Sequence, residues 1–425
     1  MNDRLRSEGV RSLLGRQHPF MRHVHIALLF GTLALTGCGS LLRNGVPVDL
    51  MATATIPGMP NVRAPAGRAD AFMARDMAIS FTQESPKDFP PGADGIVAYP
   101  HLALSGGGAN GAFGSGFLNG WTSTGTRPVF KTVTGVSTGA LMAPFAFLGP
   151  AQDDALRNFY TNTSTRDIFV LGALSSIVRQ LLFSDGIADT APLAALIATH
   201  IDDAFLRDIA AAHLGGRRLY IGTVDLDSQR FIIWNMGLIA TSGSPDAVDL
   251  FRKVMLASAS IPVAFAPVLF EVEASDGRRY DELHVDGGVA VNVFYNGNLF
   301  GTRQLRQEAG RGASREDVYV IHNGQLASSP GLTRRTIPSV ALRTLEAATH
   351  SGMIGDLFRI YAMTTFESSG YHWITIPNGI ELRGDETFDP VLMQQLYDVG
   401  YQKARAGPNW NTRPPAVLDN ATGLQ

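Results

Sequence analysis

The sequence has very little cysteine, because Cys38 is the only one among 425 residues. A single thiol excludes an intramolecular disulfide and a metal site built from several cysteines. Charged residues are also scarce, at 17%, and the net charge of −3 gives no reason to expect a nucleic-acid partner. The 45 glycines follow no fixed period, which excludes collagen-like and repeat architectures. With 45% hydrophobic residues, the chain predicts one large α/β domain with tails.

The N-terminal segment has no acidic residue between Glu8 and Asp49, and several arginines precede the apolar run 24–35. That run is too short to span a bilayer. A basic segment before a short apolar run is the form of a secretion signal, which we expect over residues 1–37.

The residues around Cys38 resemble the lipobox of bacterial lipoproteins, because the chain reads LTGC over 35–38. This resemblance implies cleavage before Cys38 and attachment of a diacylglyceryl group to its thiol. We therefore expect a lipid-anchored protein of a bacterial cell envelope, facing the periplasm or on the outer membrane. The alternatives are an ordinary signal peptide and a buried core helix with an incidental cysteine, and translation could start at Met1 or at Met21.

Composition then divides the rest of the chain. Residues 38–95 are rich in Pro, Gly and Ala, with one helical pattern over 68–79, and indicate a lipidated tether and linker. The folded domain is expected over 96–406. Residues 407–425 are rich in Pro, Asn and Thr and predict a disordered tail.

Two glycine-rich turns form the centre of the domain, and each follows an apolar run and opens into a helical pattern. The first follows a strand predicted over 101–104. Its consecutive glycines let backbone N–H groups point together into a hole that can hold an oxyanion. The glycines of this predicted oxyanion hole and its turn are Gly106, Gly107, Gly108 and Gly111.

The second turn follows a strand predicted over 129–133 and has the form G-x-S-x-G, with Gly135, Ser137 and Gly139. Such a unit of strand, sharp turn and helix presents a serine as a nucleophile. The apolar run 141–148 suits a buried helix, whose N-terminal dipole favours an anion near the serine oxygen. Ser137 could instead be a helix N-cap. Together the two turns predict an acyl-transfer site.

A dinucleotide site is the main competitor for the first turn, because Gly106, Gly108 and Gly111 satisfy G-x-G-x-x-G. That site needs an acidic residue about 20 positions further on. None occurs between Asp94 and Asp153, so we expect no nucleotide and no other cofactor.

The segment 151–214 has mainly helical patterns, which we interpret as cover helices, some bordering a lipid entrance. Two strands are predicted over 217–225 and 230–234. Asp225 and Asp227 end the first of them, but no third ligand follows at metal-site spacing, so we expect no metal site.

A third motif follows a helix predicted over 251–260, which we expect to end before Pro262. A short strand closes on Asp286-Gly287-Gly288. By itself an Asp-Gly step is most often a turn.

Taken in order, Gly106 to Gly111, the Ser137 turn and Asp286-Gly287-Gly288 resemble the patatin-like phospholipase family, and the match extends to about residue 406. The resemblance implies a three-layer α/β/α fold with a mostly parallel central sheet. It also implies hydrolysis of phospholipid or other lipid esters by a Ser–Asp dyad, here Ser137 and Asp286. Family members often have a basic residue where this chain has Asn110, which weakens the case for phospholipid over neutral ester.

An exposed aspartate is a poor base at neutral pH, so such a dyad requires that burial raise the pKa of Asp286. A Ser-His-Asp triad would instead need His322, His350 or His372, none of which lies in a recognisable motif. A further alternative is a lipid-anchored envelope protein that has kept the fold without turnover. The remaining predicted elements are strands over 317–321 and 371–376 and helices over 345–366 and 391–404.

Overall fold

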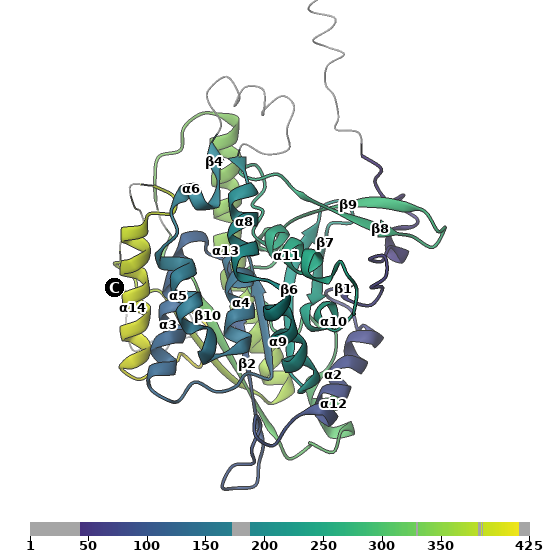
Figure 1. The fold of residues 1–425 in the computed structure, drawn as a ribbon. Coiled ribbons are helices and arrows are strands. Elements are labelled where there is room, and N and C mark those ends of the chain that lie inside the picture. Colours follow the sequence, from purple (N-terminus) through teal and green to yellow (C-terminus); the bar gives the residue numbers. More distant parts are fainter. Residues whose placement is uncertain (1–42, 172–187, 329, 381–383, 385, 416–425) are drawn as a thin grey trace, which may run out of the picture.

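The computed structural model describes residues 43–171, 188–328, 330–380, 384 and 386–415. Within these residues, a nine-stranded sheet runs through the centre of the molecule (Figure 1). Five of its strands, in the order β6-β3-β2-β10-β11, are parallel to one another. The other four, β1, β7, β8 and β9, pair antiparallel. The strands of this sheet are β1 (Arg63–Pro65), β2 (Ala98–Leu104), β3 (Thr132–Val136), β6 (Arg218–Asp225), β7 (Arg230–Asn235), β8 (Val268–Glu273), β9 (Arg279–Asp286), β10 (Arg315–His322) and β11 (Gly370–Thr375).

Helices cover both faces of this sheet, and a separate two-stranded ribbon joins β4 to β5. The ribbon consists of β4 (Val170–Leu171) and β5 (Ala188–Asp189). The helices on one face are α3 (Gly111–Ser123), α4 (Thr138–Leu148), α5 (Asp153–Thr161), α8 (Ala191–His200), α9 (Asp203–Leu214), α10 (Met236–Ala240), α11 (Ala247–Ser258) and α14 (Pro390–Arg405). Those on the other are α2 (Ala71–Gln83), α12 (Thr302–Glu308) and α13 (Ile337–Glu367). The short α6 (Thr165–Ile168) precedes β4.

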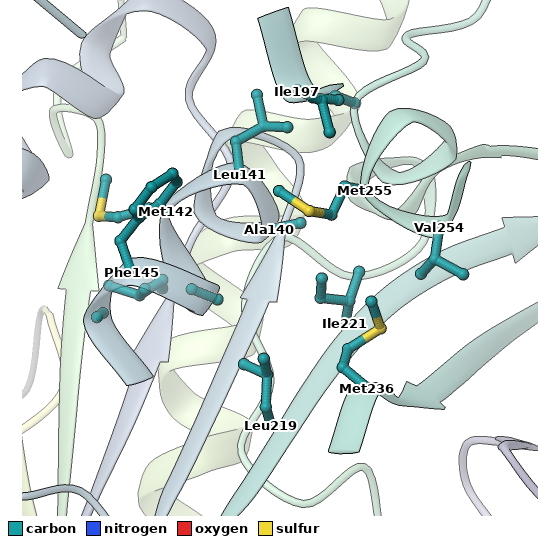
Figure 2. Packing of buried hydrophobic residues seen from close by; sticks show 14 of the residues in the cluster. Ala140, Leu141, Met142, Phe145, Ile197, Leu219, Ile221, Met236, Val254 and Met255 are labelled. Atoms are coloured by element: carbon teal, nitrogen blue, oxygen red, sulfur yellow. The ribbon is translucent and has the colours of Figure 1, made fainter. Parts of the chain in front are cut away.

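The two faces are built by alternation along the strands, as the two-residue period of a strand requires. In β6, Leu219 and Ile221 point into the first core, whereas Tyr220 points into the second. Figure 2 shows the first core, in which α4 packs between β6 and the helices α8, α10 and α11. The fold is therefore the three-layer α/β/α arrangement with a parallel sheet centre that the sequence predicted.

The apolar run 141–148 forms the buried helix α4, as predicted, with every side chain from Ala140 to Phe147 buried. The helix is apolar on all sides because neighbouring elements surround it completely and no face of it meets solvent. It therefore provides a rigid base directly behind Ser137.

The segment expected to be a tether contributes to the fold from its first described residues. Arg43 forms an ion pair with Asp227, β1 pairs with β7, and α2 packs Met73 and Met77 into the second core. The composition of this segment is that of a linker, but Met73, Met77 and Phe81 follow one another at helical spacing.

Two other boundaries also differ from expectation. The strand predicted over 129–133 is β3 at Thr132–Val136, so it includes the first glycine of the G-x-S-x-G motif. In the segment expected as a disordered tail, residues 407–415 are ordered against the domain: Trp373 exchanges backbone hydrogen bonds with Asn411, and Trp410 packs on Trp121.

Candidate functional site

The site begins at the sharp turn between β3 and α4, where Ser137 lies. Its φ of 56° and ψ of −126° are unfavourable for a residue with a side chain. The surrounding structure holds this conformation: the Ser137 N–H donates to Ser258 Oγ at 3.0 Å, and Ser258 Oγ donates to the Gly222 carbonyl at 2.7 Å. The Ser137 backbone is thereby held by α11, which carries Ser258, and through it by β6, which carries Gly222.

The glycines on either side of Ser137 are needed because backbone segments approach too closely for a side chain. A methyl group on Gly139 would overlap the Leu104 carbonyl, and one on Gly135 would overlap the Gly139 carbonyl. The motif therefore brings β2, β3 and α4 together behind the serine.

Asp286 reaches the serine through the pairing of β6. Strand β3 pairs with residues 218–222 of β6, and β9 pairs with residues 223–225. The opposite edge of β6 is occupied by β7, so β9 takes the edge that β3 leaves at its end. The two strands meet end to end from opposite directions, with Ser137 after one and Asp286 at the end of the other.

The two side chains are in direct contact. Ser137 Oγ donates to Asp286 Oδ2 at 2.6 Å, and Asp286 Oδ1 accepts the Gly288 N–H at 2.7 Å. Both residues are buried, at 7% and 4% exposure. Burial raises the pKa of Asp286 to about 7, against the opposing effects of the hydrogen bonds from Ser137 and Gly288. The carboxyl group can therefore exchange a proton near neutral pH.

The glycine turn lies beside the serine and differs in one respect from the predicted oxyanion hole. The Gly106 N–H donates to the Asn292 carbonyl at 3.0 Å, so it is already occupied. Among the described residues, the N–H groups of Gly107 and Gly108 donate no hydrogen bond, and both residues line the cavity with Ser137.

The other predicted glycines also lie around the site. Gly111 begins α3, next to Thr138 and Tyr160, and leaves no room there for a methyl group. Gly287 and Gly288 form the turn after Asp286, and Gly287 lies against the Gly222 carbonyl.

A cavity of about 690 Å³ opens over Ser137 and Asp286. This volume lies within the usual range for a small-molecule site. Its polar lining includes Asn110 and residues from the turns near the serine, and α13 contributes one helical face. The apolar lining consists of Ala109, Phe169, Ala188, Ile261, Pro262, Ala264, Phe265, Val289, Ala327, Leu342, Leu345, Met353 and Phe388.

Two of the three histidines considered for a triad, His322 and His350, line the cavity, and His322 and His372 have partners outside the Ser137–Asp286 pair. His322 Nδ1 is 3.0 Å from Ser105 Oγ, and His372 Nε2 is 3.0 Å from Asp317 Oδ1. His350 lines the cavity from α13. Within the described part of the chain, none of them hydrogen-bonds to Ser137 or Asp286.

Two further residues shape this site and were not predicted from the sequence. Ser258 Oγ accepts a hydrogen bond from the Ser137 N–H, and the Asn292 carbonyl accepts one from the Gly106 N–H. Ser258 lies in the stretch ASASIP, residues 257–262, within the span over which the chain resembles the family, and that stretch was the available signal. The role of Asn292 is carried by its backbone carbonyl, which no residue type reveals.

Other predicted sites have separate outcomes. Asp225 accepts hydrogen bonds from the Asp227 N–H and from Ser228, as a turn residue does, and the described residues contain no cluster of three or more metal-binding side chains. Cys38 and the signal segment 1–37 lie outside the described residues. In the part of the chain that is described, every helix is too short or too polar to cross a bilayer.

Comparison with known proteins places this geometry in a family. Residues 102–296 match the family model of the patatin-like phospholipases. No curated protein is similar enough in sequence to count as a match.

Solved structures similar to the chain share little sequence with it. They include VipD from Legionella pneumophila (12% identity, TM-score 0.38, 75% of this chain and 69% of that one) and human GIVD cytosolic phospholipase A2 (10%, 0.36, 81% and 64%). ExoU from Pseudomonas aeruginosa, in complex with SpcU, is also similar (15%, 0.25, 75% and 53%). The chain thus spans between 53% and 69% of these proteins. It is the family match that identifies residues 102–296 as a patatin-like phospholipase domain.

Proposed function

We propose that the protein is a serine lipid acyl hydrolase in which Ser137 is the nucleophile and Asp286 the general base. The observation that carries this proposal is the 2.6 Å hydrogen bond from Ser137 Oγ to Asp286 Oδ2, at the floor of a largely apolar cavity. Membership of the domain in the patatin-like phospholipase family supports lipid hydrolase activity. The finer assignment of class, as a carboxylic ester hydrolase, follows from the serine and its carboxylate partner.

In the first step, Ser137 Oγ attacks the ester carbonyl carbon while its proton moves to Asp286. The tetrahedral intermediate collapses, the C–O bond to the alcohol breaks, and the alcohol leaves with that proton. In the second step, water attacks the acyl-serine and gives a proton to Asp286, which returns it to Ser137 as the fatty acid is released. The raised pKa of Asp286, about 7, suits a group that acts as base and as acid.

The oxyanion would be stabilised by the N–H groups of Gly107 and Gly108. Both line the cavity beside Ser137, and both lack a hydrogen-bond acceptor among the described residues. A single donor of this kind commonly contributes about 3 kcal/mol to the transition state. Gly106 supports the turn instead, because its N–H is held by Asn292.

The triad and the non-catalytic alternatives have less support. No hydrogen bond from the described histidines reaches the serine or the aspartate, and His322 is directed to Ser105. A non-catalytic protein with this fold would have no need of a buried carboxyl group in contact with a serine in a strained turn.

The experiment that tests the proposal is release of fatty acid from phospholipids, lysophospholipids and p-nitrophenyl esters. Wild type is compared with Ser137→Ala and Asp286→Asn. Asn110 lines the cavity where relatives often carry a basic residue, so the comparison of charged with neutral esters also determines which head group is accepted.

We further propose that the enzyme acts at a membrane surface through a patch at the start of α13, here called the mouth surface. It consists of Leu332, Ile337 and Val340, which are 105%, 88% and 50% exposed, with Arg334 and Arg335 among them. Residues 318–345 contain no Asp or Glu. Exposed apolar side chains beside cations suit a bilayer with anionic head groups.

The position of the mouth surface connects it to the cavity. Leu342 and Leu345, on the turns of α13 that follow Val340, line the cavity directly. A lipid leaving a bilayer at the mouth surface would therefore meet apolar side chains along the route to Ser137.

The double variant Leu332→Glu, Ile337→Glu is expected to reduce binding to vesicles containing phosphatidylglycerol by about 100-fold, because the two side chains together lose about 3 kcal/mol of favourable free energy from burial in the bilayer. Hydrolysis of a soluble p-nitrophenyl ester should be unchanged. Sedimentation with vesicles measures the binding, in the full chain carrying Cys38→Ser. The matched control is Phe366→Glu, at the far end of α13 and 82% exposed. Equal binding by the double variant and the control would contradict the assignment.

We also propose that lipidated Cys38 anchors the protein in a bacterial cell envelope. This proposal rests on the LTGC sequence at residues 35–38. Mass spectrometry of protein extracted from bacterial membranes is expected to find a chain that begins at Cys38 and carries diacylglycerol. In Cys38→Ser, the N-terminal segment should be neither cleaved before residue 38 nor lipidated. Wild-type protein that is cleaved at another position and carries no lipid would contradict the anchor.

A further inference from the structure

A buried carboxylate on α13 lies outside the Ser137–Asp286 pair but is connected to the same site. Asp356 is 2% exposed, and its Oδ2 accepts the backbone N–H of Asn292 at 2.7 Å and that of Val293 at 3.4 Å. Its Oδ1 accepts a hydrogen bond from Arg359 at 2.9 Å. The carboxylate thus holds the backbone of the loop that follows Asp286.

The same loop holds the glycine turn from its other side. The Asn292 carbonyl accepts the Gly106 N–H at 3.0 Å, and its side-chain Nδ2 donates to the Thr349 carbonyl of α13 at 2.9 Å. Asn292 is therefore fixed to α13 through both its N–H and its side chain, and the carbonyl of the same residue fixes Gly106. A continuous series of hydrogen bonds runs from Asp356 to the residue before Gly107.

The burial of Asp356 has a free-energy cost that packing alone does not require. Burial raises the pKa of Asp356 to about 6, although the two backbone N–H groups and Arg359 favour its ionised form. An apolar residue at this position on α13 would fill the core without that cost, but it would leave the Asn292 N–H without an acceptor. The carboxylate therefore serves the loop, by accepting the backbone N–H groups of Asn292 and Val293.

We propose that Asp356 is a positioning residue of the active site. By holding the backbone of Asn292, it fixes the hydrogen bond to the Gly106 N–H and so aims the N–H groups of Gly107 and Gly108 at the oxyanion. This inference rests on the proposed function, because it assigns those two N–H groups to the transition state.

The chain offers a matched control on the same helix. Glu367 is 6% exposed, and its Oε2 accepts the backbone N–H of Arg303 at 2.7 Å. It is therefore also a buried carboxylate of α13 that holds the backbone of another element. It lies eleven residues after Asp356, about 16 Å further along the helix.

The test measures kcat and KM for a soluble p-nitrophenyl ester, together with the rate at which a fluorophosphonate labels Ser137. Asp356→Asn keeps one acceptor and should lower kcat about 10-fold, and Asp356→Ala about 100-fold, with KM changed by less than about 3-fold. The labelling rate should fall in parallel, because the phosphonate adduct places a similar charge at the oxyanion position. Glu367→Gln should keep the wild-type kcat even where thermal stability falls.

Three results would overturn the inference: unchanged kcat in both Asp356 variants, a change confined to KM, or an equal loss of kcat in Glu367→Gln. Asp356→Asn preserves the shape of the side chain and carries the test if Asp356→Ala does not fold. The failure of the proposed function has a different signature, because wild type itself would then neither hydrolyse esters nor react with the fluorophosphonate.

Discussion

Replacing Asp286 with asparagine is expected to lower kcat for ester hydrolysis by about 10³- to 10⁴-fold, a loss comparable to that of removing a carboxylate from a serine-hydrolase triad. The amide can still accept the Gly288 N–H, so the turn is preserved, but it cannot take the proton of Ser137. In wild type, kcat/KM should rise with pH and level off above about 7, since the ionised form of Asp286 is the base. Initial rates between pH 5 and 9 measure both effects.

The same substitution should stabilise the protein at alkaline pH. Because burial raises the pKa of Asp286 from 3.8 to about 7, the folded state binds this proton more tightly than the unfolded state does. The free energy of unfolding therefore decreases as pH rises from about 4 to about 7, by up to about 4 kcal/mol. Asp286→Asn removes this decrease, so its Tm should exceed that of wild type by on the order of 5 °C at pH 8 and equal it near pH 4.

A suitable control is Asp225→Asn, because Asp225 is also a buried carboxylate on a strand next to β9 but lies away from Ser137. It should retain the wild-type kcat. A wild-type rate in Asp286→Asn would mean that another group acts as the base, and a lower Tm at pH 8 would contradict the raised pKa of Asp286.

Ser137→Ala is expected to abolish turnover, with a loss of kcat of about 10⁴-fold or more, because no other hydroxyl group of the described residues hydrogen-bonds to Asp286. Labelling by a fluorophosphonate should disappear completely. Mass spectrometry of the labelled wild-type protein should locate the adduct on the peptide that contains Ser137. The turn has φ of 56° in wild type, and alanine changes neither that backbone requirement nor the hydrogen bond from residue 137 to Ser258.

Ser80→Ala provides the comparison for this experiment. Ser80 is a fully buried serine on α2, and its hydroxyl donates to the Met77 carbonyl. It should label and turn over as wild type does. If Ser137→Ala still labels, the nucleophile lies elsewhere, and if wild type neither labels nor releases fatty acid, the domain is a non-catalytic lipid-anchored protein.

The parts of the site that the sequence predicted are those in which one residue type is required by backbone geometry. Gly139 must be glycine because Leu104 lies against it, and Asp286 precedes two glycines at the end of a strand. Such requirements produce a sequence motif in which given residue types occur at fixed spacing. Composition indicated only one large α/β domain, and the three-layer arrangement was expected because the family that these motifs resemble has that fold.

The parts that could not be predicted depend on backbone groups or on residue types without a strong preference. The Gly106 N–H is occupied by a backbone carbonyl, and Asp356 acts through backbone N–H groups 63 and 64 residues away. The helical pattern over 68–79 predicted α2, but the linker-like composition of residues 43–95 did not indicate that β1 and α2 would pack into the domain. The predicted position of β3 was three residues too early, since Gly135 was taken as part of a turn, although strands accept glycine where another backbone approaches closely.

The end-to-end meeting of β3 and β9 on one edge of β6 has a consequence for how the separation of serine and carboxylate is maintained. Both strands are hydrogen-bonded to β6. The rise per residue along β6 therefore sets the distance between Ser137 and Asp286. A slip of β9 by one position would turn Asp286 to the opposite face of the sheet. The loops that border the cavity can therefore vary in length and sequence without altering the reactive pair, as long as these two registers are kept.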